Sequence, residues 1–368
     1  MSQHVFLSHR DSQRLFDALD RAGYQAQAPQ PKDGALVFSP IRQASDLPWG
    51  QHDTQRPGHY RLSQDDSPRA FAWANGPQAL KPQLFAPSEP LWQVARDADG
   101  KLRFQACAPK PQKRALIGVR PCDLAALAIH DAHFLGGERD GHYAARREGL
   151  LLVAVNCSHP AQTCFCVSTG DGPAAKEDSG YDLLLDELDD GFVIRAGSGA
   201  GEQLLAGLAL EAATPGQLAS AKGQQHQATQ GQLRHLPDNM ASALPNQMTH
   251  PQWDKVAERC LACGNCTAVC PTCFCHSERE QPALDGASSE HLREWDSCFS
   301  SGHSYLHGHL VRESGAQRYR QWLMHKLAWW PEQFGRIGCV GCGRCISWCP
   351  VGIDISAEAH LLCQGGEA

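Results

Sequence analysis

The chain has 368 residues and seventeen cysteines, and its 33 Lys and Arg against 40 Asp and Glu give a net charge of −7. That length predicts two or three domains, and the mild acidity and lack of a long apolar run argue against nucleic acid and membrane partners. No signal peptide is evident, so we expect a cytoplasmic protein whose cysteines bind metal or do redox chemistry and do not form disulfides.

The N-terminal segment, residues 1–210, is predicted to form an α/β domain. Continuous apolar runs at 115–119 and 150–155 predict strands that are buried on both faces. Between them, Asp123 can begin a helix whose apolar residues recur at helical spacing as far as Phe134. A strand, a helix and a strand within about forty residues indicate a parallel crossover unit.

Four cysteines follow these two strands. Cys122 comes after the first strand, Cys157 after the second, and Cys164 and Cys166 lie close behind. The crossover unit would bring both strand ends to one edge of the sheet, where α/β domains build sites, and it would place Cys122 at a helix N-terminus, where the dipole favours a thiolate. The four thiols therefore indicate a possible extra iron–sulfur site, and the alternative is that some are buried as small apolar side chains.

The remainder of the chain changes in composition. Residues 211–250 are rich in Gln, Ala, His, Ser and Asn, which predicts a polar linker with some helix. Residues 251–368 have few β-branched runs and long amphipathic stretches, for instance 317–330, so we expect a mainly α-helical domain. The overall fold class is predicted to be α+β, with an α/β domain followed by this helical domain.

One cysteine pattern occurs twice, as Cys-x2-Cys-x2-Cys-x3-Cys-Pro. In two-cluster ferredoxins three cysteines of such a run ligate one cluster, and the fourth ligates the other cluster. Zinc sites use separated cysteine pairs, which is the weaker interpretation here. We therefore expect two [4Fe–4S] clusters with these ligands: Cys260, Cys263, Cys266 and Cys349 for one, and Cys339, Cys342, Cys345 and Cys270 for the other. The long interval 272–338 is similar to the helical insert in iron–sulfur subunits of respiratory reductases.

Other residues in this half are open to two interpretations. Cys273, Cys275 and Cys298 could hold a further cluster only if Asp296, a histidine or a borrowed thiol completes the set. His303 and His307 could share a helix face and bind a metal, but a surface cluster is the expectation. The same holds for the basic residues of the helix before the second motif, where a solvated face is expected and compensation of cluster charge is the alternative: Arg318, Arg320, His325 and Lys326.

Several of these segments together resemble a known family, the β subunits of cytoplasmic sulfhydrogenases. The iron–sulfur A subunit of anaerobic sulfite reductase is similar. The resemblance begins near residue 80 and rests on the two motifs, on Gly118–Leu124, on Tyr143 with Arg146, Arg147 and Glu148, on Asn156 and Cys157, on Cys164–Cys166, on Gly180–Leu183, on Cys270–Cys275 and on Trp295–Cys298.

The resemblance implies an iron–sulfur electron-transfer subunit within an oxidoreductase complex. Its partners would be a flavin subunit that binds NAD(P)H and a catalytic NiFe hydrogenase, or in the alternative a sulfite reductase. No catalytic motif is evident in this chain. Two other hypotheses remain: a self-contained iron–sulfur reductase, and a structural metal-binding module without redox function.

Overall fold

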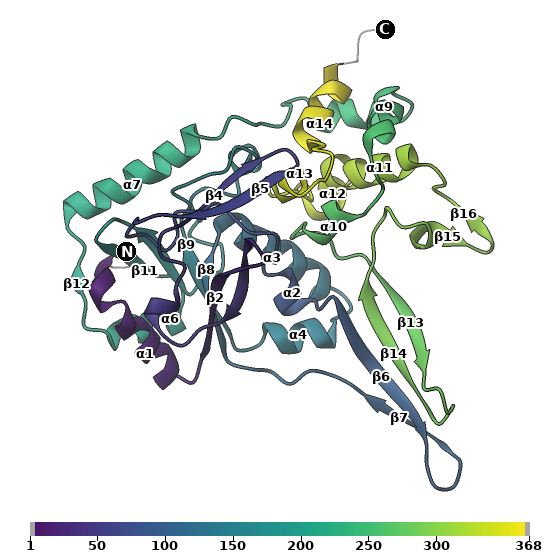
Figure 1. The fold of residues 1–368 in the computed structure, drawn as a ribbon, viewed down its shortest axis with the longest axis horizontal. Coiled ribbons are helices and arrows are strands. Elements are labelled where there is room, and N and C mark those ends of the chain that lie inside the picture. Colours follow the sequence, from purple (N-terminus) through teal and green to yellow (C-terminus); the bar gives the residue numbers. More distant parts are fainter. Residues whose placement is uncertain (1–3, 365–368) are drawn as a thin grey trace.

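A computed structural model describes residues 4–364 of the chain (Figure 1). Residues 1–3 and 365–368 lie outside the described part. The outer ends of the predicted ranges 1–210 and 251–368 therefore lie outside it as well. None of the described helices is both long enough and apolar enough to cross a bilayer.

The N-terminal half is built on a mixed sheet of eight strands. The strands span Val5–Ser8 (β1), Gln25–Lys32 (β2), Ala35–Pro40 (β3), Arg114–Val119 (β8), Leu150–Val155 (β9), Leu183–Glu187 (β10), Gly191–Ala196 (β11) and Glu211–Ala212 (β12). Their order is β12-β1-β11-β10-β9-β8-β2-β3, in which β10, β9, β8 and β2 are parallel and the outer pairs antiparallel. The two predicted strands are confirmed as β8 and β9.

Helices cover both faces of this sheet, and its central strand β9 is apolar and buried at every position. In β9, Leu151 and Val153 pack with the helices α1 and α6, while Leu152 and Ala154 pack with α2, α3 and α4. The helices span Gln13–Arg21 (α1), Lys81–Leu84 (α2), Pro121–Phe134 (α3), Gly141–Arg147 (α4), Cys166–Thr169 (α5) and Gly199–Ala206 (α6), with short 3₁₀ turns at His9–Asp11 and Ala44–Asp46. The predicted crossover helix is confirmed as α3, but it begins at Pro121 with Arg120 as its N-cap, so Asp123 lies in its first turn and does not cap it.

The segment predicted as a linker is largely helical in the structure. It holds α7 (Pro215–Gln230), α8 (Met240–Ala243) and a 3₁₀ turn at Leu244–Asn246. Helix α7 contacts the sheet through its glutamines, since Gln224 donates to the carbonyl of Glu187 at 3.0 Å and Gln225 to Asp186 at 2.7 Å. The domain boundaries at 210 and 250 stay a prediction.

The C-terminal segment contains helices and strands. The helices are α9 (Gln252–Arg259), α10 (Asn265–Ala268), α11 (Gly315–Met324), the π-helical turn η5 (His325–Trp329), α12 (Trp330–Phe334), α13 (Arg344–Ser347) and α14 (Ile355–Gln364). The strands are β13 (His276–Pro282), β14 (Ser288–Trp295), β15 (Tyr305–Leu306) and β16 (His309–Leu310), with a 3₁₀ turn at Gly302–Ser304. The stretch 317–330 is helical as predicted. The mainly helical description of the domain is not confirmed, because the interval between the motifs opens with two hairpins.

The first of these hairpins joins a strand pair from the N-terminal half. Strand β14 pairs antiparallel with β6 (Ser88–Arg96), which pairs with β7 (Leu102–Ala106), and the resulting four-stranded sheet has the order β13-β14-β6-β7. It projects from the body of the protein and is called the arm below (Figure 1). A further hairpin, β4 (Gln51–Arg56) and β5 (His59–Gln64), lies in the N-terminal half.

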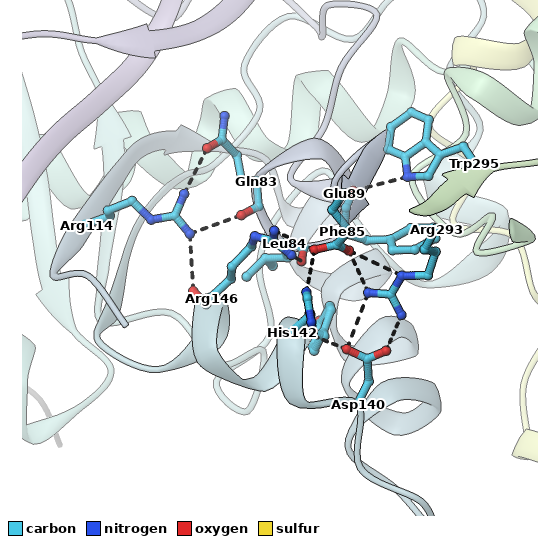
Figure 2. A network of polar contacts seen from close by, with 11 residues as sticks. Gln83, Leu84, Phe85, Glu89, Arg114, Asp140, His142, Arg146, Arg293 and Trp295 are labelled. Carbon is cyan, nitrogen blue, oxygen red and sulfur yellow. Dashed lines mark hydrogen bonds and ion pairs between the residues drawn. The ribbon is translucent and has the colours of Figure 1, made fainter. Parts of the chain in front are cut away.

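The base of the arm is held by a buried polar network (Figure 2). The carboxylate of Glu89, at the start of β6, accepts hydrogen bonds from Arg146 at 2.6 Å and from Arg293 at 2.6 Å. It also lies 2.8 Å from Nδ1 of His142, and Arg293 pairs with Asp140 as well. The network therefore fixes β6 and β14 to α4, which gives Arg146, one of the residues behind the family resemblance, a structural role.

Candidate metal centre

The first cysteine motif lines a cavity together with one cysteine of the second motif. Cys260 follows the end of α9, and a left-handed Gly264 (φ 71°) turns the chain into α10. Four of the predicted ligands line this cavity beside the rings of Phe299, Tyr319 and Trp322: Cys260, Cys263, Cys266 and Cys349. Crossed ligation requires this juxtaposition, and the ligation itself stays a prediction. Cys345 also reaches the cavity wall.

The other predicted set, Cys339, Cys342, Cys345 and Cys270, is also brought together. Burial raises the pKa of Cys339 to about 12, and the negative charges of Cys342 and Cys270 add to this effect. Burial likewise raises the pKa of Cys345 well above its ordinary value, with contributions from the same thiols. Such thiols keep their protons until a metal displaces them.

Backbone N–H groups point at the sulfur atoms of both sets. Ala262 donates to Cys260 at 3.4 Å, Gly341 to Cys339 at 3.4 Å and Ile353 to Cys349 at 3.3 Å. Hydrogen bonds to the ligand sulfurs are among the features that tune iron–sulfur clusters. Grouped thiols, amides directed at sulfur and apolar walls fit a cluster better than they fit an ordinary core.

The N-terminal thiols lie beside the second motif. Cys122, Cys164 and Cys166 are buried, and the Sγ atom of Cys164 is 3.9 Å from the carbonyl oxygen of Cys342. After burial, the charges of Cys166 and Cys157 contribute to the raised pKa of the Cys164 thiol. The predicted convergence at the ends of β8 and β9 is therefore present.

The expectation that the helix dipole favours a thiolate at Cys122 is corrected by the structure. This residue is the second of α3, as the sequence predicted, but its side chain is buried. Burial and the neighbouring carboxylate of Asp123 raise the pKa of Cys122 well above its ordinary value. Desolvation therefore outweighs the helix dipole at this position.

Two glycines of the second motif allow it to lie against the N-terminal half. A Cβ atom at Gly341 would come within 2.5 Å of the backbone of Phe165, and one at Gly343 within 2.4 Å of the carbonyl oxygen of Thr163. The N–H of Phe165 donates to the carbonyl of Gly341 at 2.8 Å. Any side chain would push the two segments apart, so the contact requires glycine at both positions.

An ion pair locks the same contact. Arg344, which begins α13, binds both carboxylate oxygens of Asp123 in α3, at 2.7 and 3.1 Å. It also donates to the carbonyl of Gly76 at 2.8 Å. Both charged side chains are buried, so the pair fixes the second motif to the helix that carries Cys122.

The remaining candidate thiols lie near the groups that could complete their set. Cys273, Cys275 and Asp296 line one pocket. His303 lies 3.2 Å from Asp296, and the neighbouring Cys275 and Asp296 raise the pKa of His303. Burial, then the charge of Cys275, raises the pKa of Cys298 to about 12.

A shared helix face for the two histidines is wrong, since His303 lies in a 3₁₀ turn and His307 in the turn between β15 and β16. Within residues 4–364, no three His, Cys, Asp or Glu side chains are placed to hold a single metal ion.

The solvated face expected for the helix before the second motif is wrong for Lys326. Its side chain is 6% exposed, and its Nζ lies 3.2 Å from Sγ of Cys270. The reason is helical spacing, because Lys326 lies three residues after Leu323 and four after Trp322, both of which are buried. Lys326 therefore belongs to the buried face of the helix, and its place beside Cys270 agrees with the alternative expectation, compensation of cluster charge.

Comparison with known proteins agrees with this centre. Two family models, each described as a 4Fe-4S dicluster domain, match residues 259–353 and 222–274. The chain is similar to the sulfhydrogenase 2 subunit beta of Pyrococcus furiosus, with 33% identity over 246 residues, which cover 66% of this chain and 72% of that protein. No solved structure matches the chain at a significant level.

Proposed function

The chain belongs to the family of sulfhydrogenase beta subunits, and from this premise we propose that it relays electrons between a flavin subunit that binds NAD(P)H and a catalytic NiFe hydrogenase subunit. It is an iron–sulfur electron-transfer subunit of a sulfhydrogenase-type complex. The observation that carries the relay is the grouping of Cys349 with the first motif in one cavity. Crossed sets require two neighbouring clusters, and neighbouring clusters suit electron hopping.

Each motif has a defined part in this proposal. Cys260, Cys263, Cys266 and Cys349 hold one [4Fe–4S] cluster, and Cys339, Cys342, Cys345 and Cys270 hold the other. When bound, the clusters supply one-electron transfer. The rings of Phe299, Tyr319 and Trp322 exclude water from the first set, and amides of the motif loops donate to its sulfur atoms.

We also propose an additional cluster at Cys122, Cys157, Cys164 and Cys166. Its support is the convergence of the four thiols next to Cys342. A further site at Cys273, Cys275 and Cys298 remains a prediction, with Asp296 and His303 as candidates to complete it.

The exposure of the thiols suggests where electrons leave or enter. All seventeen cysteines lie in the described residues, and Cys263 is the exposed one among them. Leu261 and Val351, which line the same cavity, are exposed as well. We therefore place the exchange with a partner subunit at the first cysteine set.

The test of the proposal is a pair of cysteine variants in the anaerobic full chain. We expect Cys349→Ser to remove the cluster of the Cys260 set and Cys270→Ser that of the Cys339 set, because serine replaces one ligand thiolate in each. Iron, acid-labile sulfide and the EPR spectrum of the reduced protein would be measured.

Cys363→Ser is the control, since Cys363 lies in α14 outside the motifs. A wild-type chain that carries zinc, or that lacks [4Fe–4S] signals, would contradict the relay. Turnover of a substrate by the isolated chain would instead favour a self-contained reductase.

A further inference from the structure

Lys326 is a buried cation without a carboxylate partner. Its side chain is 6% exposed, and no Asp or Glu in the described part of the chain lies within ion-pair distance of it. An unpaired ammonium group in such a place is costly. Its counter-charge must therefore come from something other than a carboxylate.

The contacts of Lys326 identify that counter-charge. Its Nζ donates to Sγ of Cys270 at 3.2 Å, to Oγ1 of Thr272 at 2.9 Å and to the carbonyl of Gly338 at 3.5 Å. Cys270 is a predicted cluster ligand, and a cysteine that ligates a metal carries a negative charge as its thiolate. The counter-charge of the Lys326 ammonium group is therefore the sulfur of Cys270, 3.2 Å away.

The same contacts join the end of the first motif to the start of the second. Thr272 donates to the carbonyl of Gly338 at 2.8 Å, and the N–H of Gly338 donates to the carbonyl of Lys326 at 2.7 Å. Cys270 and Cys339 belong to one predicted ligand set, so Lys326 contacts that set at the point where its two parts meet.

Within residues 4–364, no lysine or arginine donates a hydrogen bond to a sulfur atom of the other ligand set. Cys349 occupies the position in the second motif that Cys270 occupies in the first, and among the described residues its recorded hydrogen-bond donor is the N–H of Ile353 at 3.3 Å. Lys81 is also buried, but it donates to the carbonyl of Thr267 at 3.1 Å and lies over the ring of Trp295. The two sets therefore differ in the positive charge placed against their ligands.

We propose that Lys326 is a positioning residue that holds Cys270 and raises the reduction potential of the cluster at Cys339, Cys342, Cys345 and Cys270, while leaving the other cluster unaffected. The inference rests on the proposed function. Reduction adds negative charge to a cluster, so a fixed cation in a poorly solvated site favours the reduced form.

The experiment is an EPR-monitored redox titration of the full chain with Lys326→Met, which keeps the length and removes the charge. Cys349→Ser and Cys270→Ser assign the signals to the two sets. We expect the midpoint of the Cys270 signal to fall by at least 59 mV, which is a tenfold change in the reduced-to-oxidised ratio of a one-electron couple. The other midpoint should not move, and Lys326→Arg should restore most of the shift.

Controls separate the possible outcomes. Lys222→Met, in the distant helix α7 (Figure 1), should leave both midpoints unchanged. Fully loaded Lys326→Met with unchanged midpoints, or with both shifted equally, overturns the inference.

If Lys326→Met fails to load the Cys270 cluster, Lys326→Gln takes its place. Loss of that cluster from both neutral variants but not from Lys326→Arg supports the inference that the positive charge is needed. Loss of the cluster from all three variants shows that Lys326 acts through packing and overturns the inference. Absence of two signals from the wild type would refute the proposed function itself.

Discussion

At the scale of the residue, the buried charge of Arg344 stabilises the contact between the second motif and α3. Its guanidinium pairs with Asp123 in a site where both side chains are buried. Replacing Arg344 by Met leaves the carboxylate buried and unpaired. We expect this variant to lower the free energy of unfolding by about 3–5 kcal/mol, measured from the urea midpoint under anaerobic conditions.

The double variant Arg344→Met with Asp123→Leu tests that cause. Both charges are then absent, so much of the lost stability should return. If the double variant is as unstable as the sum of the two single variants, the ion pair is not the source of the effect.

At the scale of the element, the arm depends on the network around Glu89. Burial alone would raise the pKa of Glu89, but hydrogen bonds from Arg146, Arg293 and His142 hold it below its ordinary value. A carboxyl group with a lowered pKa stabilises the fold above its unfolded-state pKa, near 4.3, and loses that contribution as the pH falls through the folded value.

We therefore expect Glu89→Gln to destabilise the base of the arm at pH 7 by about 1–3 kcal/mol, because Arg146 loses an ionised acceptor while Arg293 keeps Asp140. The difference from wild type should shrink as the pH falls below about 4. Pulsed hydrogen exchange of the amides of β6 and β14 would measure both effects. Glu278→Gln, on the exposed strand β13, should change little.

The arm also marks the limit of what the sequence could predict. The strands β8 and β9 and the helix α3 were predictable because each carries its own apolar pattern. Strand β13 is exposed at every position and has no such pattern. It is a strand because β14 pairs with it and with β6, and β6 lies far away in the sequence. No local signal could reveal that pairing.

The candidate site also has a part that the sequence predicts and a part that depends on the tertiary structure. Spacing alone predicted which thiols would lie together, since the motif carries its own geometry. The contacts of Lys326 and Arg344 join segments that are distant along the chain, so they depended on the tertiary structure.

At the scale of the whole molecule, the two halves share both the arm and the metal centre. Strands β13 and β14 need β6, and the second motif needs Asp123 and the backbone of Thr163 and Phe165. We expect a fragment covering residues 251–368 to fail to load the Cys339 set, because these supports are missing. Iron and sulfide content would be measured, and co-expression with residues 1–250 should restore loading. Full loading of the isolated fragment would contradict this dependence.

The sheet of the arm has a consequence for synthesis. Arg293 and Glu89, which clamp its base, are 204 residues apart in the chain. During translation the edge of β6 therefore stays unpaired until β14 has been synthesised, and unpaired strand edges can pair with other chains. We expect the nascent protein to need a chaperone during this interval. Because the second motif follows β14 in the chain, the metal centre can be completed only after β14 has emerged and can cover that edge.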